Sequence, residues 1–338
     1  MSALHTEPGR DVVLAARGVS KEYTVGPRLL GTRQRVRAVD HVDLTVHARE
    51  TLGVVGESGS GKSTLAAMLV GDERPTSGEI ELLGRPLHHH SSRELRRARR
   101  DIQLVRQDPY TSLDPRMTIE TIVREPLDCN PDLVPRGRRR AVVHELLELV
   151  GLNPDHADRY PHQFSGGQRQ RVGIARALAL SPRILVCDEP VSALDLSVQA
   201  QVVNLLERLG QELDLACVFI AHDISVVHHV ADRIAVMYLG RIVEQADHSD
   251  LLVRARHPYT TALLAAVPDP DRGSASGREQ IVLRSEIPSP LDPPSGCHFR
   301  TRCWKAEERC AEEQPLLESA PYGRGHIAAC HFPLPPRD

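Results

Sequence analysis

The sequence predicts an α/β protein built around a doubly wound, largely parallel β-sheet. Short apolar runs alternate with segments of helical periodicity, and this order of elements is the one that parallel sheets require. One apolar run, residues 52–55, leads through a glycine-rich turn into a helical segment at residues 64–69. Another, residues 184–187, ends at the carboxylate pair Asp188-Glu189. A carboxylate at the end of such a strand faces the crevice where ligands bind.

The glycine-rich turn has the composition of a phosphate-binding loop. Its glycines let the backbone fold back so that successive N–H groups point into one concavity, and the following helix adds the positive end of its dipole. Lys62 is expected to reach the β- and γ-phosphates of a nucleotide, and the Ser63 hydroxyl to ligate Mg²⁺. A loop without a nucleotide is the alternative, and the strand–loop–helix context argues against it. The candidate nucleotide-binding residues are Gly56, Glu57, Ser58, Gly59, Ser60, Gly61, Lys62, Ser63 and Thr64.

Composition and charge exclude several classes of protein. The 338 residues suit one large domain or two, with 41% apolar and 26% charged residues, as in an ordinary globular protein. A net charge of -3 gives no basic surface, so we expect no nucleic-acid partner. No apolar run reaches the ~18 residues of a membrane span, and the N-terminus lacks a signal pattern. We therefore expect a cytosolic protein whose seven cysteines are reduced or metal-bound.

The first part of the chain is expected to contain several strands. Residues 12–23 and 38–47 have strand patterns with a loop at residues 26–37 between them, and residues 79–83 form a further strand after a turn. Tyr23 lies in the first strand. Its ring could stack on an adenine base, and the alternative is a half-buried strand tyrosine; the sequence leaves both interpretations open.

Helical periodicity dominates the middle of the chain. A strand at residues 102–105 precedes Gln107, and the pattern is helical from about residue 108 to residue 180. Gly151 ends one amphipathic helix, and Ser165 is the expected N-cap of the next.

The remaining elements continue the alternation and then give way to a tail. A helix at residues 198–213 precedes a strand at residues 217–220, which ends near His222. A hairpin is expected at residues 234–245. Residues 268–296 are rich in proline, which indicates a linker or a loosely wrapped extension.

Taken in order, these motifs resemble those of the ABC-transporter ATPases. The match spans roughly residues 12–256, and the Ser-Gly-Gly-Gln sequence at residues 165–168 distinguishes it from other P-loop proteins. The resemblance implies a cassette at residues 1–256 with a RecA-like core, an antiparallel β subdomain and a helical subdomain at about residues 108–180. The elements that carry it are the glycine-rich loop, Gln107, residues 165–168, Asp188-Glu189, residues 192–195 and His222.

The resemblance also assigns roles in ATP hydrolysis. Asp188 is expected to hold Mg²⁺ together with Ser63 and Gln107, and Glu189 to polarise the attacking water as general base. His222 would contact the γ-phosphate, while Gln107 would sense metal and nucleotide. In this family a second set of residues serves the ATP of a partner subunit across a head-to-tail dimer. That set is Ser165, Gly166, Gly167, Gln168 and Asp195.

Three further stretches look like the oligopeptide, dipeptide and nickel importer branch of the family. They are residues 107–117, residues 257–268 and the cysteine-containing tail. The resemblance implies an ATP-hydrolysing importer subunit at the cytoplasmic face of the membrane, with an extension at residues 257–338. It also implies a second ATPase subunit in a heterodimer, two transmembrane permease subunits and an extracellular solute-binding protein. The first stretch is typical of the second ATPase of such systems.

The alternative function is that of a soluble ABC ATPase in DNA repair or translation. Repair members insert a long coiled coil, and translation members carry two cassettes with basic linkers. The sequence has no heptad run, a single cassette and a net charge of -3, and all three features argue against this class.

Four cysteines in the tail are expected to bind a [4Fe–4S] cluster. Four thiolates suffice for such a cluster, and the resemblance to the importer branch supports it. Their spacing is looser than that of paired zinc ligands, so zinc, with help from nearby histidines, is the alternative; unliganded thiols are the other. The four residues are Cys297, Cys303, Cys310 and Cys330.

Overall fold

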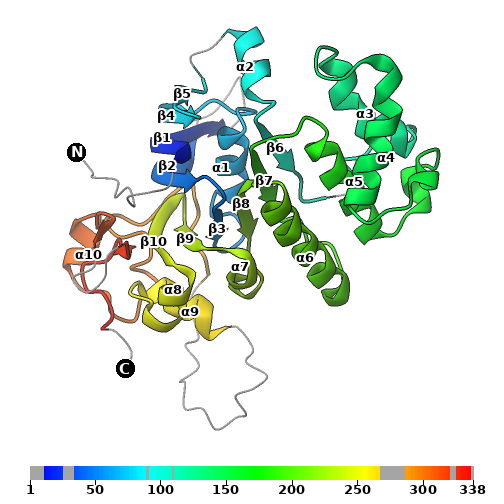
Figure 1. The fold of residues 1–338 in the computed structure, drawn as a ribbon. Coiled ribbons are helices and arrows are strands. Elements are labelled where there is room, and N and C mark those ends of the chain that lie inside the picture. The colour runs from blue at the N-terminus through cyan, green and yellow to red at the C-terminus, as the bar shows by residue number, and fades with distance from the viewer. Residues whose placement is uncertain are drawn as a thin grey trace.

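The predicted alternation of strands and helices forms an eight-stranded sheet in a computed structural model of the chain (Figure 1). The structure describes residues 11–25, 34–88, 91–108, 110–266, 286–319 and 325–335. The strand order is β11-β12-β10-β9-β3-β8-β7-β6, with β9, β3, β8, β7 and β6 parallel. Their bounds are β3 (Thr51–Val55), β6 (Ile102–Val105), β7 (Ile184–Asp188), β8 (Ala216–Ala221), β9 (Arg233–Tyr238), β10 (Arg241–Asp247), β11 (Glu318–Ser319) and β12 (Ile327–Ala328).

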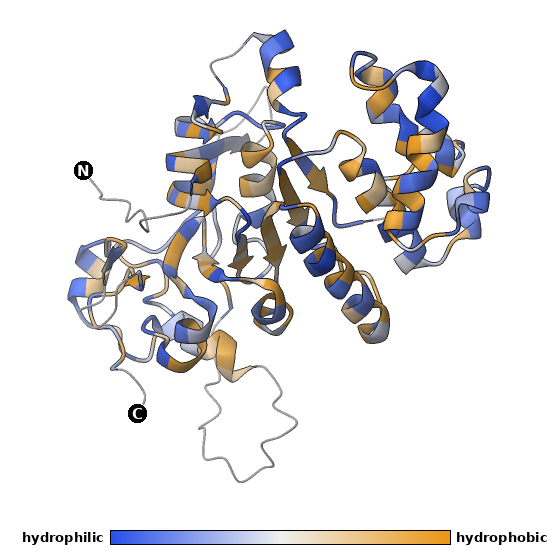
Figure 2. Ribbon diagram, viewed as in Figure 1, coloured by the Kyte–Doolittle hydropathy of each residue, from blue (hydrophilic) through white to orange (hydrophobic). Residues whose placement is uncertain are grey.

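The central strands are apolar on both faces because both faces are covered. In β7, Ile184 and Val186 belong to one hydrophobic core, whereas Leu185 and Cys187 belong to the other. This alternation is the two-residue period of a strand, and it explains why a continuous apolar run identified β7. The central strands accordingly appear orange in Figure 2, whereas the helices beside them are of mixed colour.

A four-stranded antiparallel sheet covers one face of this core. Its order is β2-β1-β4-β5, with β1 (Val12–Val25), β2 (Gln34–His47), β4 (Ser77–Leu82) and β5 (Arg85–Pro86). Helix α1 (Lys62–Leu69) contacts both β2 and β7, and it shares one hydrophobic core with both sheets. The predicted loop at residues 26–37 was too long, because the ladder continues to the pair Val25–Gln34 and Arg37 bonds Glu22 across it at 2.9 Å.

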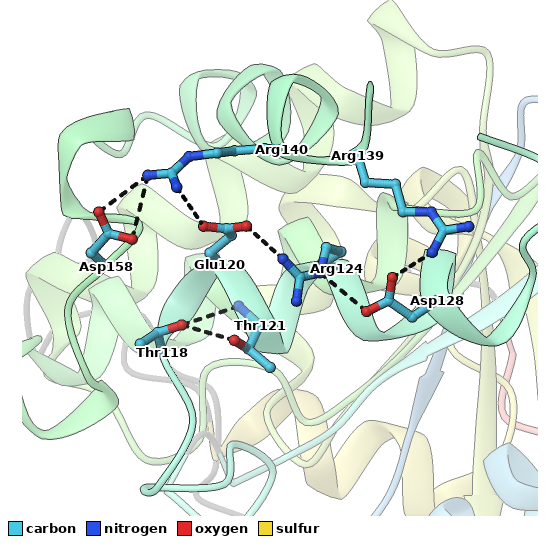
Figure 3. A network of polar contacts seen from close by, with 8 residues as sticks. All are labelled: Thr118, Glu120, Thr121, Arg124, Asp128, Arg139, Arg140 and Asp158. Atoms are coloured by element: carbon cyan, nitrogen blue, oxygen red, sulfur yellow. Dashed lines mark hydrogen bonds and ion pairs between the residues drawn. The ribbon is translucent and has the colours of Figure 1, made fainter. Parts of the chain in front are cut away.

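The helical segment stands to one side of the sheet and is held together partly by ion pairs. Its main helices are α3 (Ile119–Cys129), α4 (Arg139–Leu149) and α5 (Gly166–Leu178). Figure 3 shows two arginines at the start of α4 that bond acids on α3. Arg139 Nη1 lies 2.7 Å from Asp128 Oδ1, and Arg140 Nη1 lies 3.4 Å from Glu120 Oε2. These pairs add a small contribution to the apolar packing that holds α4 on α3.

The other helices lie between the strands or in the tail. None of the helices in the described parts of the chain has the length and hydrophobicity needed to cross a membrane. They are α2 (Ser92–Ala98), η1 (Arg136–Arg138), η2 (Pro154–His156), η3 (Pro161–Gln163), α6 (Leu196–Glu212), α7 (Ile224–Val230), α8 (His248–Arg254), α9 (Pro258–Ala265) and α10 (Arg309–Glu312).

The tail packs against the core and extends its main sheet. Strand β12 pairs antiparallel with β10, so two very short tail strands extend the main sheet at its edge. Phe299 is 1% exposed and contacts the rings of Tyr238 and Tyr259 at centroid distances of 5.3 and 5.4 Å. The predicted linker at residues 268–296 lies largely outside the described residues.

Candidate functional site

The glycine-rich loop packs tightly against two neighbouring strands. A Cβ atom on Gly56 would lie 2.1 Å from the carbonyl oxygen of Met237, and one on Gly61 would lie 2.1 Å from that of Ala38. Gly61 also has a φ of 102°, in the left-handed region that favours glycine. Close backbone approach therefore requires glycine at these two positions.

Lys62 lies inside the curve of this loop. Its side chain is 4% exposed, and Nζ donates hydrogen bonds to the carbonyl oxygens of Gly56 at 2.8 Å and Glu57 at 3.0 Å. Burial lowers the pKa of Lys62, and the carboxylate of Glu189, 3.8 Å away, opposes that shift. The result is a desolvated cation that faces acidic side chains at the carboxyl edge of the sheet.

Two oxygen ligands suited to a divalent cation lie side by side next to Lys62. Ser63 Oγ donates a hydrogen bond of 3.1 Å to Asp188 Oδ1. Burial raises the pKa of Asp188, and the Ser63 bond partly opposes the rise. A hydroxyl and a partly desolvated carboxylate are hard oxygen donors, so this pair fits Mg²⁺, which takes few protein ligands and keeps waters and phosphates as the rest.

Glu189 is the hub of the remaining contacts. Its φ of 46° is unusual for a non-glycine residue and turns the chain sharply at the end of β7. Gln107 Nε2 donates to Glu189 Oε2 at 2.9 Å, and His222 Nδ1 lies 3.7 Å from the same oxygen. Gln107 follows β6, Glu189 follows β7 and His222 follows β8. Side chains from three strand ends thus meet, together with Lys62, at the Glu189 carboxylate.

The Ser-Gly-Gly-Gln sequence lies elsewhere, at the start of α5. Ser165 is the N-cap, as expected, and it forms a capping box with Gln168. Gly167 packs so closely on α6 that a Cβ atom would lie 2.3 Å from Val198 Cγ1. In the described residues, no hydrogen bond or ion pair joins this sequence, which includes Gly166, to the glycine-rich loop. Asp195 stands at the start of α6, next to the 84% exposed Leu196.

Tyr23 keeps both of its interpretations. It is half-buried in β1, opposite Val36 of β2, and the ammonium of Lys21 lies 5.2 Å from its ring centroid. A ring that already contacts a cation can still offer its other face to a base.

Sequence reasoning missed the tail residues that hold the glycine-rich loop. Arg302 makes two hydrogen bonds to the Glu57 carboxylate, at 2.6 and 3.0 Å, and the Tyr259 hydroxyl accepts one from the Glu57 backbone N–H at 2.9 Å. The only signal in the sequence was their place in stretches already singled out, Tyr259 after His257-Pro258 and Arg302 just before Cys303.

The four tail cysteines lie near one another. The backbone N–H of Cys297 donates to the carbonyl oxygen of Cys310 at 2.8 Å. Burial raises the pKa of Cys330 to about 12, and the charges of the other three thiols, including Cys303, add to the rise. All seven cysteines are free. In the described parts of the chain, which include these four, no group of three or more His, Cys, Asp or Glu is arranged to hold a metal ion.

Comparisons with known proteins agree with the geometry. The family described as "ABC transporter" matches residues 39–192, and "Oligopeptide/dipeptide transporter, C-terminal region" matches residues 243–310. The oligopeptide transport ATP-binding protein AppF of Bacillus subtilis is 46% identical over 97% of this chain and 99% of its own length. The dipeptide transport ATP-binding protein DppF of Haemophilus influenzae is 48% identical over 94% and 96%.

A solved structure extends the likeness to the cassette fold. A dimeric ATP-binding cassette in a post-hydrolysis state, bound to ADP and Pi, superposes with a TM-score of 0.62 and 31% identity. The match covers 70% of this chain and 98% of that cassette.

Replacing Gly56 with alanine tests the close approach of the loop to β9. The Cβ of Gly56→Ala would overlap the Met237 carbonyl, so the loop must shift, and we expect affinity for Mg-ATP to fall by at least about tenfold. Isothermal titration of the purified chain measures it. Gly84→Ala is the matched control, because Gly84 has a φ of 73° but no heavy atom within 4 Å of its Cβ position. Equal affinity of the two variants would contradict the close-approach argument.

Proposed function

This chain belongs to the ABC transporter family of ATP-binding proteins, and we propose that it is the ATP-hydrolysing subunit of an importer for oligopeptides or dipeptides. The observation that carries the proposal is the convergence of five polar side chains around the buried ammonium of Lys62. They come from the ends of the three strands β6, β7 and β8 and from the start of α1, and they are Ser63, Gln107, Asp188, Glu189 and His222. Matches to peptide-transport subunits that cover 94–97% of this chain and 96–99% of theirs support the substrate class.

Each residue has a task in transferring the γ-phosphoryl group to water. The loop N–H groups and Lys62 bind the phosphates, and Ser63 with Asp188 would hold Mg²⁺, which neutralises developing charge on the phosphate oxygens. Glu189 accepts the proton of the attacking water. Gln107 and His222 both contact Oε2 of Glu189, and these contacts would hold the carboxylate in place for that step. Tyr23 is proposed to stack on the adenine.

A second nucleotide site is proposed to form across a dimer. In the described residues, no hydrogen bond or ion pair joins Ser165, Gly166, Gly167, Gln168 or Asp195 to the glycine-rich loop of their own chain, and exposed Leu196 beside Asp195 is suited to an interface. The related cassette solved as a dimer supports this arrangement. We propose that the partner is a second ATPase subunit and that the pair docks on two membrane permeases, fed by an extracellular solute-binding protein. The chain would then lie at the cytoplasmic face of the membrane.

We also propose that the tail cysteines bind a [4Fe–4S] cluster, with zinc as the alternative. The presence of four free thiols near one another supports the proposal, although their present arrangement is not that of a metal site. Metal binding would have to draw the sulfur atoms together and displace their protons, and the raised pKa values of Cys297, Cys303 and Cys330 oppose that loss. The role would be structural.

Replacing Glu189 with glutamine tests the general base. The amide keeps the shape and can still bond Gln107, but it cannot accept a proton. We expect Mg-ATP binding to be nearly intact and hydrolysis by the assembled importer to fall about 10²–10⁴-fold. Glu207→Gln, on the exposed side of α6, is the control and should hydrolyse ATP normally. Retained ATPase activity in Glu189→Gln would refute this role.

Replacing Ser165 with alanine tests the site across the dimer. We expect vanadate trapping of a photoreactive ATP to fall at least about tenfold on the partner subunit, whereas Lys62 of the altered chain still binds its nucleotide. Ser91→Ala is the matched control, since Ser91 also caps a helix in a capping box but lies on α2. Loss of trapping on the altered subunit alone would contradict the trans arrangement.

Metal analysis after anaerobic purification tests the cluster. We expect about four iron and four sulfide per chain and a brown colour, and Cys303→Ser should bleach it. Cys129→Ser removes an exposed cysteine outside the tail and should leave the colour unchanged. Near-stoichiometric zinc without iron would contradict the proposed [4Fe–4S] cluster and support a zinc site instead.

A further inference from the structure

We propose that Arg302, in the C-terminal extension, is a positioning residue for ATP binding that neutralises Glu57 and holds it away from the phosphates. The inference rests on the proposed function, because it concerns the same phosphate loop. It assigns the tail a direct part in nucleotide affinity, 245 residues away in sequence from the loop that it contacts.

The contact has the geometry of a strong ion pair. Arg302 Nη1 lies 2.6 Å from Glu57 Oε2, and Nη2 lies 3.0 Å from Oε1, so the guanidinium and the carboxylate face each other as two forks. The Arg302 side chain is 6% exposed and that of Glu57 is 23% exposed. Water therefore screens the pair little, and its geometry is held by the surrounding protein.

Glu57 needs such a partner because it is an acid in an anion-binding loop. It follows Gly56 directly, and its backbone carbonyl accepts a bond from Lys62, the group that would bind the phosphates. Its charge also acts on Lys62, where it is one of the three acids that raise the pKa against burial. An unpaired carboxylate here would repel a triphosphate. When Glu57 is paired with Arg302, the two charges cancel and the repulsion of the phosphates is removed.

The tail holds Arg302 firmly enough to do this. The backbone N–H of Arg302 donates to the carbonyl oxygen of Phe299 at 3.0 Å, in the same turn whose Phe299 ring is buried. The guanidinium carbon lies 5.9 Å from the ring centroid of Tyr238, and Tyr259 from the same aromatic group bonds the backbone of Glu57. Side chain and backbone of Glu57 are thus both fixed by one cluster. Loosening the tail would release both contacts together.

Removing the charge of Arg302 and then that of Glu57 distinguishes neutralisation of Glu57 from a role of Arg302 in stabilising the tail alone. Arg302→Met keeps most of the side-chain volume but leaves Glu57 unpaired, and we expect the dissociation constant for Mg-ATP of the full chain to rise about tenfold. Adding Glu57→Gln in the same chain removes the repulsion, so the double variant should recover most of the lost affinity.

Isothermal titration with Mg-ATP at two salt concentrations, and thermal unfolding of each variant, make up the experiment. Arg309→Met is the matched control, because it breaks an exposed tail ion pair with Glu313, 2.8 Å long, that does not reach the loop. Its affinity should be unchanged. Unchanged affinity for Mg-ATP in Arg302→Met would overturn the proposal. A loss of affinity that persists in the double variant with Glu57→Gln would also overturn it, because Arg302 would then only stabilise the tail. Failure of the unaltered chain to bind Mg-ATP would instead refute the proposed function, and this inference with it.

Discussion

The site depends on burying one ammonium group, that of Lys62, at the carboxyl edge of the parallel sheet. Taking that cation out of water is costly unless acids and carbonyl oxygens surround it. The loop backbone supplies two carbonyl oxygens, and Glu189 supplies the nearest carboxylate. The parallel strands make this possible, because their carboxyl ends bring residues from distant parts of the chain to one place. The groups that compensate the buried charge of Lys62 are therefore part of the same arrangement that provides the catalytic geometry.

Sequence patterns predicted the parts of this arrangement that follow local rules. The apolar run ending at Asp188 identified a buried strand, Ser165 as the expected N-cap marked the start of α5, and the hairpin turned where expected. The resemblance to ABC-transporter ATPases is confirmed by the comparisons. The start of β2 was placed too late, since polar residues continue that ladder through cross-strand ion pairs and carry no apolar alternation.

The tail escaped prediction for a different physical reason. Its two strands have two residues each, too few for any period to be visible, and they exist because β10 offers an unpaired edge. The ion pair between Glu57 and Arg302 joins residues 245 apart in sequence, and no local pattern around either one predicts the contact. The proline content of residues 268–296 gave no sign that Phe299, three residues farther along, enters the main core.

A buried carboxylate connects the tail to the phosphate loop by a second route. Glu244 on β10 is fully buried and bonds His326 of the tail at 2.7 Å, and it also accepts the backbone N–H of His257 at 3.0 Å. Burial lowers the pKa of His257 to about 4, so its ring is neutral near pH 7 and Nδ1 can accept the Tyr259 N–H at 3.1 Å. That bond caps α9 and fixes Tyr259, whose hydroxyl accepts the backbone N–H of Glu57. Because every polar group along this route is partnered in the interior, a shift of the tail strand has to be accommodated at the loop, which makes the extension part of the nucleotide site's framework.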